Sequence, residues 1–381
     1  MIPPWKSYAA RLAAEVTPPG SRWARPVAQT PRHDFVPRWW QRRSDGAGYE
    51  VFEWEKVDDW FAGAFSDRSL LTRVGTQHVD QAAEGESVQG LPTSSATMPS
   101  LVVKMLRHGL LQDSSRLLYV GTGSGYGPAL AAHRLGEDQV VGVDIDPYLV
   151  ESAQRRLDGA GLHPQLHVAD ATGVLPVGDG DIDRIVAMVS VRKIPTSWLE
   201  ALPVGGRLVT TIAGTSLLVT AEKNADGGAS GRVEWDRAGF MQARHGADYE
   251  FWPDSLVTAM TASEGEEVTT GLYPVVDVEQ AWDLASMLDL TTPGIVHRFS
   301  AADDRRIAVM AHPDGSWARA EGIGTERPTV HQVGPQRLWD ALDAIRTDWL
   351  ARGELPVRGA RVIVKPDGRT ILVRGGWHTH T

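Results

Sequence analysis

Three glycines follow a short apolar run in LLYVGTGSGYG, at residues 117–127. Gly121, Gly123 and Gly125 are spaced G-x-G-x-G, with Thr122 and Ser124 between them. Glycines in such a loop let the backbone approach a ligand closely and direct the following helix towards it. The loop therefore predicts a nucleotide-type cofactor, although position 126, where a dinucleotide fingerprint has its third glycine, is a tyrosine.

Two aspartates follow the next two apolar runs. Asp144 ends QVVGVD and is followed by Ile145, and Asp170 ends HVAD and is followed by Ala171. An acid after the second strand accepts hydrogen bonds from ribose hydroxyls, and one after the third can meet an adenine amino group. Together with the glycine loop, these acids favour S-adenosylmethionine over NAD. The alternative is a tight turn followed by two solvent-facing acids.

The surrounding pattern supplies the elements that must position these residues. From Pro99 onwards, helical apolar spacing alternates with short buried-strand runs as far as GRLVTTI at 206–212. Such alternation predicts an α/β fold, a doubly wound Rossmann-type sheet with ligands at the carboxyl ends of its parallel strands. We assign this cofactor-binding domain to residues 91–245.

Two further regions flank this domain. Residues 1–90 form an N-terminal region rich in tryptophan, for which we favour core and lid packing over an aromatic peptide-binding surface. Residues 246–381 contain two Pro-Asp-Gly hairpins around a helix that places Leu338, Leu342, Ile345 and Trp349 on one face. We expect a separate C-terminal α+β domain. Six of the 14 tryptophans lie in the first 60 residues: Trp5, Trp23, Trp39, Trp40, Trp54 and Trp60.

Composition limits the classes of function. The 381 residues carry a net charge of −10, which argues against broad binding to nucleic acid or anionic membranes. The chain has no cysteine, and its histidines show no metal-binding spacing, so we expect no metal site. The N-terminus lacks the apolar core of a secretion signal, and no apolar run is long enough to span a membrane. A cytoplasmic enzyme is expected.

Linked motifs bring a family into view. These are PRHDFVP at 31–37, PTSSATMPSLVVKML at 92–106, the glycine loop, VVGVDIDPYLVESA at 140–153, and HVADATGVLP at 167–176. Over about residues 30–215 the sequence resembles protein-L-isoaspartate O-methyltransferase. The resemblance implies a Rossmann-type enzyme that uses S-adenosylmethionine to esterify a carboxylate of a peptide.

Several positions depart from that family's pattern. Its Ser-x-Pro segment, which places a hydroxyl at the active site, corresponds best to Thr97-Met98-Pro99. Another register would use Ser94 or Ser95 instead. Tyr119 stands where an acid usually contacts the methionine ammonium group, and Arg192 and Lys193 stand where the repair enzymes have small residues.

With these departures and the long tail, the sequence resembles one branch of that family, whose members act in the biosynthesis of ribosomally made, post-translationally modified peptides. Members of that branch methylate an aspartate of a macrocyclic precursor, and the ester then closes to an aspartimide. A graspetide pathway is our first choice and a lanthipeptide pathway the second. The alternatives are a general L-isoaspartyl repair methyltransferase and a noncatalytic peptide-binding protein.

The chemistry of a carboxylate acceptor suggests roles for the polar residues. A carboxylate is already ionised at neutral pH, so methyl transfer to it needs alignment more than a strong base. Thr97 or Ser95 would orient the carboxylate as the catalytic hydroxyl, with Ser94 beside them. Arg192 would hold the second oxygen, or be a solvated loop arginine. His33 would contact the substrate or support local structure.

Overall fold

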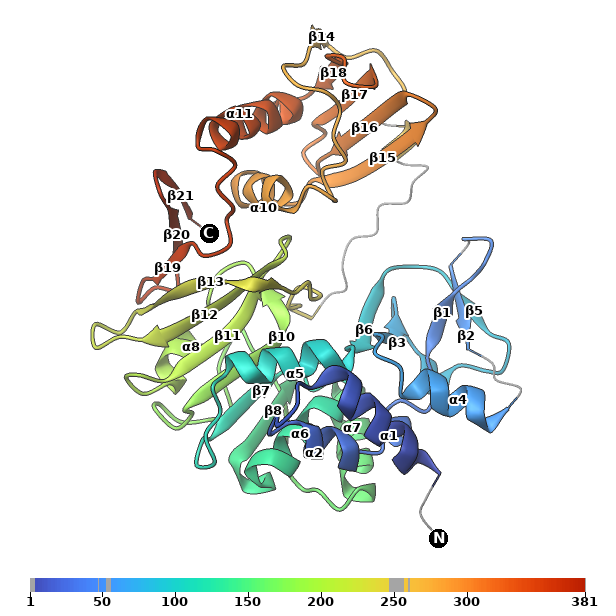
Figure 1. The fold of residues 1–381 in the computed structure, drawn as a ribbon, viewed down its shortest axis with the longest axis vertical. Coiled ribbons are helices and arrows are strands. Elements are labelled where there is room, and N and C mark those ends of the chain that lie inside the picture. The colour runs from blue at the N-terminus through green and yellow to red at the C-terminus, as the bar shows by residue number, and fades with distance from the viewer. Residues whose placement is uncertain (1–3, 47, 53–55, 247–256, 260, 381) are drawn as a thin grey trace.

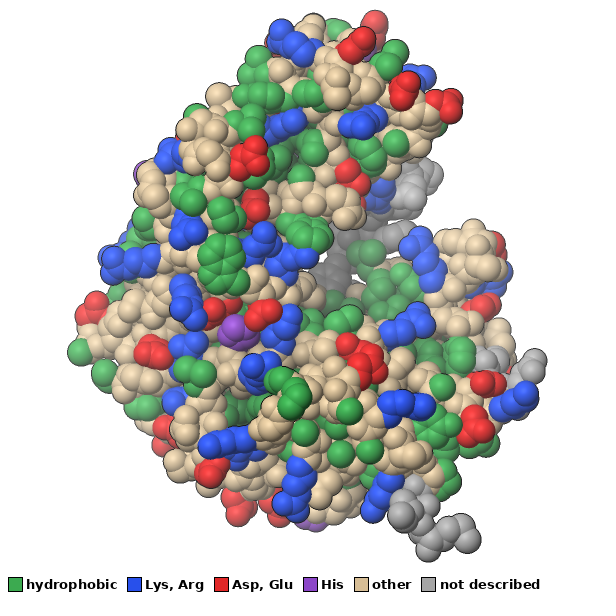
Figure 2. All heavy atoms as spheres, viewed as in Figure 1, with side chains coloured by type: hydrophobic (Ala, Val, Ile, Leu, Met, Phe, Trp, Pro, Cys, Tyr) green, Lys and Arg blue, Asp and Glu red, His purple; other side chains and the backbone are tan. Residues whose placement is uncertain are grey.

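Three β-sheets organise the computed structural model, which describes residues 4–46, 48–52, 56–246, 257–259 and 261–380 (Figure 1). A ten-stranded sheet forms the centre, a six-stranded sheet lies in the N-terminal part, and a five-stranded sheet lies in the C-terminal part. In Figure 2, basic and acidic side chains are interspersed over the visible face, so the negative net charge is not gathered in one patch there. None of the described helices has the length and apolar character needed to cross a membrane.

Five parallel strands form the cofactor-binding half of the central sheet, in the order β9-β8-β7-β10-β11. Every residue of the LLYV strand is buried, as expected for an inner parallel strand covered on both faces. The expected Rossmann-type arrangement is therefore confirmed. The strands are β7 (Leu117–Val120), β8 (Val140–Asp144), β9 (Gln165–Val168), β10 (Arg184–Val191) and β11 (Arg207–Ile212). The associated helices are α5 (Pro99–His108), α6 (Tyr126–Leu135), α7 (Pro147–Gly159) and α8 (Thr196–Ala201), with the short 3-10 helix η2 (Glu137–Gln139).

The other half of this sheet is antiparallel and draws on the end of the chain. Strands β12 (Leu217–Lys223) and β13 (Ala229–Arg237) follow β11, and β13 then pairs with β19 (Arg361–Val364). Strands β20 (Thr370–Arg374) and β21 (Trp377–His380) complete the edge. The second expected hairpin thus forms, but it extends the central sheet rather than belonging to a separate C-terminal domain. Its side chains Val362, Val364 and Leu372 are buried in the same core as Val219, which the local pattern could not reveal.

The C-terminal unit proper lies between β13 and β19 in sequence. Its sheet has the order β14-β18-β17-β16-β15, with two helices packed against it (Figure 1). Leu338 and Leu342 are buried there, while Ile345 and Trp349 also pack against the central core, so the expected apolar face of the helix is confirmed. The elements are β14 (Glu267–Thr270), α10 (Trp282–Thr291), β15 (Val296–Ala302), β16 (Arg305–Ala311), β17 (Trp317–Ile323), β18 (Thr329–Val333) and α11 (Leu338–Ala351).

The N-terminal part combines helices with a sheet of order β4-β3-β1-β2-β5, and β6 also pairs with β3. Because β6 belongs to this sheet, the N-terminal unit extends past the expected boundary at residue 90. Trp23, Trp39 and Trp40 are buried, which supports core packing for them, and Trp54 lies outside the described residues. The helices are α1 (Trp5–Val16), α2 (Ala24–Gln29), α3 (Arg32–Phe35), α4 (Val57–Ala64) and the 3-10 helix η1 (Val79–Gln81). The strands are β1 (Trp40–Arg42), β2 (Tyr49–Val51), β3 (Leu70–Val74), β4 (Gln77–His78), β5 (Ser87–Val88) and β6 (Pro92–Ala96).

The position of β19 gives a test of the fold. Val362→Asp should lower the free energy of unfolding by about 3 kcal/mol or more, because it leaves an unpaired charge in the central core. Val268→Asp, on the half-exposed strand β14, should change it by less than about 0.5 kcal/mol. Urea denaturation followed by tryptophan fluorescence measures both variants. Equal stability of the two would mean that β19 is not part of the central core.

Candidate active site

A cavity of about 380 Å³ opens at the carboxyl ends of the parallel strands. This is the position at which doubly wound sheets bind ligands, and the volume lies in the range of small-molecule sites. Four segments form most of its wall: the glycine loop, the ends of β8 and β9, the strand residues 92–97, and the segment 239–244 that follows β13. Among the described residues, no group of three histidine or acidic side chains gathers to hold a metal ion.

The glycine loop has the conformation that the sequence predicted. Gly121, Gly123 and Gly125 have φ angles of 84°, 54° and 89°, in the left-handed region that favours glycine. The first two line the cavity with Thr122 and Ser124, whereas Gly125 precedes α6 and packs against α7. The hydroxyl of Thr122 is buried against Gly142 of β8 and has no hydrogen-bond partner among the described residues.

Asp144 lies at the carboxyl end of β8 and faces the cavity beside Ile145. Its Oδ2 accepts a hydrogen bond from the backbone N–H of Gly123 at 2.8 Å, and its Oδ1 accepts one from the N–H of Asp146 at 3.1 Å. Burial raises the pKa of Asp144, while these two N–H groups oppose the rise. The carboxylate is thus fixed in place and keeps further acceptor capacity for a pair of hydroxyl groups.

Asp170 also lines the cavity, at the end of β9, next to Ala171. Its Oδ1 accepts hydrogen bonds from the backbone N–H and the hydroxyl of Thr172, and Nδ1 of His245 lies 3.2 Å from Oδ2. Burial acts to raise the pKa of Asp170, but these hydrogen bonds outweigh burial and hold the pKa below its usual range. The two acids therefore stand at one edge of the sheet, as predicted.

The hydroxyl groups expected near the substrate all reach the cavity. Ser94, Ser95 and Thr97 line it, together with Ser69 and Thr93. The Ser94 hydroxyl accepts a hydrogen bond from Thr72 at 2.9 Å. By contrast, the side-chain hydroxyls of Ser95 and Thr97 have no hydrogen bond to another described residue, which leaves them available to a substrate.

Two candidate residues do not reach this cavity. His33 is 7% exposed and packs among the rings of Trp5, Trp60, Phe61 and Phe65, so it belongs to the N-terminal core. Burial lowers the pKa of His33. The expectation that it contacts the substrate is wrong because the short helix α3 turns its side chain inward.

Arg192 is held away from the site by a partner that is remote in sequence. Its guanidinium donates to the Asp289 carboxylate at 2.8 Å, and this contact joins the end of β10 to α10 of the C-terminal unit. Sequence reasoning left this residue open between a carboxylate ligand and a solvated arginine. The structure shows an ion pair between two parts of the fold.

Segment 239–244 is the wall that sequence reasoning missed. It is tied to β10 because the N–H of Ser190 donates to Met241 O at 2.9 Å and the N–H of Ala243 donates to Ser190 O at 2.8 Å. Its last residue, Arg244, is the single basic side chain among the described residues that line the cavity. No periodic pattern marks this irregular segment, which ends beside the boundary expected at residue 245.

The walls of this cavity coincide with a segment that known proteins share. Residues 74–237 match the family model described as protein-L-isoaspartate(D-aspartate) O-methyltransferase. A protein-L-isoaspartate O-methyltransferase of Thermococcus onnurineus NA1 is 35% identical over 137 residues, which are 35% of this chain and 59% of that protein. One of Bradyrhizobium sp. ORS 278 is 31% identical over 134 residues, 34% of this chain and 61% of that protein.

The part of the wall that carries the glycine loop, Asp144 and Asp170 thus matches the protein-L-isoaspartate O-methyltransferase family, whereas the wall segment 239–244 lies beyond the matched residues. The chain spans about three-fifths of the length of these two curated relatives. A solved structure named protein-L-isoaspartate O-methyltransferase is 16% identical, has a TM-score of 0.50 and covers 99% of both chains, which shows similarity of fold. The similarity of fold therefore extends over the long tail as well.

Tyr119 replaces the acid expected before the first glycine of the loop. It lines the cavity and is 3% exposed, and burial raises its pKa, so the phenol is neutral. Gly127 makes room for the ring, because a Cβ at this position would overlap the Tyr119 hydroxyl. Tyr119 therefore supplies no negative charge to a bound ligand. Its ring fits only because Gly127, in the first turn of α6, has no side chain.

The steric relation between Tyr119 and Gly127 can be tested by a double-mutant cycle. Gly127→Ala should lower the free energy of unfolding by about 2 kcal/mol through overlap with the ring. Combined with Tyr119→Ala, the same substitution should cost at least about 1 kcal/mol less. Gly159→Ala in α7, where a Cβ meets no neighbour within 4 Å, is the control and should be neutral or stabilising. Additive effects of the two substitutions would exclude the overlap.

The buried carboxylate of Asp144 predicts a pH dependence of ligand affinity. S-adenosylhomocysteine should bind tightly at pH values above the pKa of Asp144. Its affinity should fall as the pH drops through that pKa, because the protonated acid is a poorer hydrogen-bond acceptor. Since burial raises this pKa, the loss should begin above the ordinary value of about 4. Calorimetry over a pH series should show a flat, weak profile for Asp144→Asn. Asp170→Asn should weaken binding but keep the wild-type profile, and an unchanged profile in Asp144→Asn would contradict the assignment.

Proposed function

We propose that this protein is an S-adenosylmethionine-dependent carboxyl O-methyltransferase that acts on isoaspartyl residues of peptides or proteins. The observation that carries the proposal is one cavity that combines the glycine loop, two acids, and two hydroxyls that have no hydrogen-bond partner among the described residues. All of these groups lie within the segment that matches the family. A noncatalytic peptide-binding protein would have no need of such a cofactor cavity beside free hydroxyls.

The cofactor would be held mainly by the glycine loop and the two acids. Asp144 would accept from the ribose hydroxyls, and Asp170 with the backbone of Ala171 would meet the adenine. Bound there, S-adenosylmethionine supplies an electrophilic methyl group. Because Tyr119 is neutral, the ammonium group of the methionine part would rely on backbone carbonyls and hydroxyls of the cavity instead of a carboxylate.

The remaining wall fits a carboxylate acceptor. Hydroxyl groups from Ser95 and Thr97 can donate to its oxygens, and Arg244 provides a positive charge at the same cavity. A carboxylate is ionised at neutral pH, so these groups need only orient it and exclude water. The proposed reaction requires no base to remove a proton from the acceptor.

The identity of the acceptor separates two forms of this proposal. The names of the relatives favour isoaspartyl residues, whose acceptor is the free α-carboxylate. The narrower alternative is esterification of an ordinary aspartate in a macrocyclic ribosomal peptide, followed by closure to an aspartimide. Its main argument from sequence was the long tail, and that argument is weakened by the solved structure that matches over 99% of both chains.

A methylation assay with matched peptides tests the proposal. The protein would be incubated with methyl-labelled S-adenosylmethionine and one of three peptides: an isoaspartyl peptide, its aspartyl counterpart, or a cyclised aspartyl peptide. We expect base-labile methyl ester mainly on the isoaspartyl peptide. Ester only on the cyclised peptide, followed by loss of methanol, would favour the biosynthetic alternative. No ester on any peptide, despite cofactor binding, would favour the noncatalytic one.

If Ser95 or Thr97 orients the substrate carboxylate, removing its hydroxyl should lower activity without changing cofactor affinity. Thr97→Val should reduce kcat/KM for the peptide about tenfold or more, since it removes a hydrogen bond to a charged group, while the Kd of S-adenosylhomocysteine stays unchanged. Thr329→Val, at an exposed position of β18, is the matched control. If Thr97→Val is silent and Ser95→Ala is impaired, Ser95 is the orienting hydroxyl. If both are silent, neither hydroxyl contacts the carboxylate.

A further inference from the structure

One short stretch of the N-terminal sheet, residues 73–80, contacts the start of α7 directly and is linked to the glycine loop through Arg156. It comprises the end of β3, the strand β4 and the start of η1. The side chains of Arg73, His78 and Asp80 contact α7 or the residue before it, and Arg73 also donates to the Thr93 hydroxyl of its own sheet at 3.0 Å. These contacts are formed by groups that are mostly buried, so water screens them weakly.

The first contact is centred on Asp146, the residue that precedes α7. Nε2 of His78 lies 3.1 Å from Asp146 Oδ2, and Nε of Arg73 lies 3.5 Å from the same oxygen. The three side chains are 9%, 11% and 11% exposed for His78, Arg73 and Asp146. Nδ1 of His78 is buried without a hydrogen-bond partner among the described residues, which leaves Nε2 as the nitrogen that serves Asp146.

Asp146 in turn holds the acid of the cavity. Its other oxygen, Oδ1, accepts the N–H of Tyr148 at 3.0 Å and caps α7, and its own backbone N–H donates to Asp144 Oδ1 at 3.1 Å. The His78 and Tyr148 rings also contact each other, with centroids 4.3 Å apart. The direction of the Asp144 carboxylate therefore depends on a turn that His78 and Arg73 fix from outside.

A second contact reaches the glycine loop. Asp80 Oδ2 accepts from Arg156 Nη2 at 2.5 Å and from the Tyr148 hydroxyl at 3.3 Å. Nη1 of the same arginine points to the carbonyl of Ser124 at 3.5 Å. Thus the two loops that shape the cofactor cavity are braced by the same stretch of the N-terminal sheet.

We propose that His78, assisted by Arg73, is a positioning residue for cofactor binding, acting on Asp144 through Asp146. This inference rests on the proposed function, since it takes Asp144 as the acid that receives the ribose hydroxyls. His78 does not line the cavity and would not touch the cofactor. Its role is to keep the Asp146 N–H, and with it the carboxylate of Asp144, in the orientation that the cofactor needs.

Substitution of His78 tests this role. His78→Leu removes the donor and should weaken binding of S-adenosylhomocysteine about tenfold in calorimetry. His78→Gln retains an N–H donor of similar reach and should restore the affinity to within about threefold of wild type. With saturating cofactor and an isoaspartyl peptide, kcat of His78→Leu should stay near the wild-type value while KM for S-adenosylmethionine rises.

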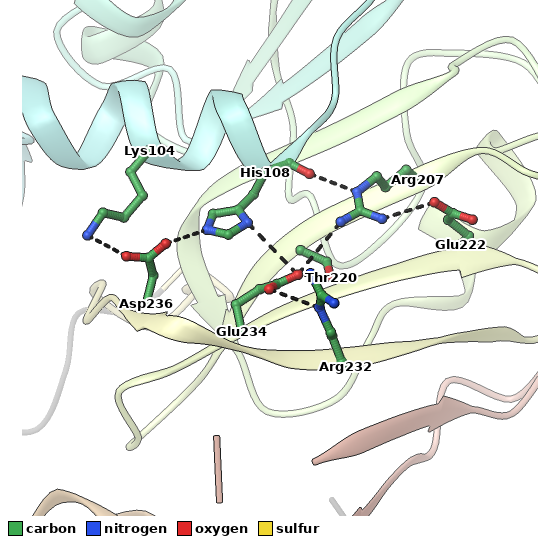
Figure 3. Close-up of polar contacts among 8 residues, drawn as sticks. All are labelled: Lys104, His108, Arg207, Thr220, Glu222, Arg232, Glu234 and Asp236. Atoms are coloured by element: carbon green, nitrogen blue, oxygen red, sulfur yellow. Dashed lines mark hydrogen bonds and ion pairs between the residues drawn. The ribbon is translucent and has the colours of Figure 1, made fainter. Parts of the chain in front are cut away.

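The chain provides a matched control in His108, at the end of α5 (Figure 3). Its Nε2 lies 2.9 Å from Asp236, and it joins α5 to β13 within a network that includes Lys104 and Glu234. His108 is a histidine paired with a carboxylate, as His78 is, but it is not part of the cavity wall. His108→Leu should therefore lower the free energy of unfolding without changing the affinity for S-adenosylhomocysteine.

The outcomes separate this inference from the proposed function. If the wild-type protein does not bind S-adenosylhomocysteine, both fall. If it binds and His78→Leu binds equally well, or if His108→Leu loses as much affinity, only the positioning role is overturned. Should His78→Leu fail to fold, Asp146→Ser replaces it, because serine can still cap α7 but is too short to offer His78 a second polar atom. That variant should show the same tenfold loss, and wild-type affinity in it would overturn the inference.

Discussion

The burial of one carboxylate, that of Asp144, constrains much of the architecture around the cavity. Burial raises its pKa, and two backbone N–H groups compensate for part of the lost hydration. Both donors need a specific backbone shape. Gly123 must adopt a left-handed conformation, and Asp146 must cap the start of α7 while His78 and Arg73 hold its side chain. The acid at the centre of the site is thus supported by a sheet that precedes the cofactor-binding strands in sequence.

The parts of the site that the sequence predicted are those set by local pattern. Apolar runs such as β7 and the helical spacing of α5 and α6 depend on neighbouring residues only. Since the carboxyl ends of parallel strands meet at one edge of a sheet, the glycine loop, Asp144 and Asp170 could be placed together before the structure was known. The hydroxyls of Ser95 and Thr97 did not follow from this pattern; the resemblance of Thr97-Met98-Pro99 to the family's Ser-x-Pro segment pointed to them.

The parts that it did not predict depend on partners far away along the chain. Arg192 meets an aspartate 97 residues later, and the final hairpin pairs with β13 across the whole C-terminal unit. PRHDFVP drew attention to His33, yet the buried guanidinium of Arg32 makes the long-range contacts, to the carbonyls of Ala64, Ser66 and Arg68. Burial lowers the pKa of that guanidinium to about 10. Periodicity within a segment carries no information about such pairings.

The chain segments that join the C-terminal unit to the central sheet lie next to the cavity. The unit leaves the central sheet after β13 and returns to it at β19, and these two strands are neighbours. The first part of the outgoing connection is the segment 239–244, which closes the cavity and is hydrogen-bonded to Ser190. Arg192 lies two residues after Ser190, and its ion pair with Asp289 attaches the C-terminal unit to this end of β10. The wall segment that carries Arg244 and the ion pair to the C-terminal unit are therefore both attached to the same end of β10.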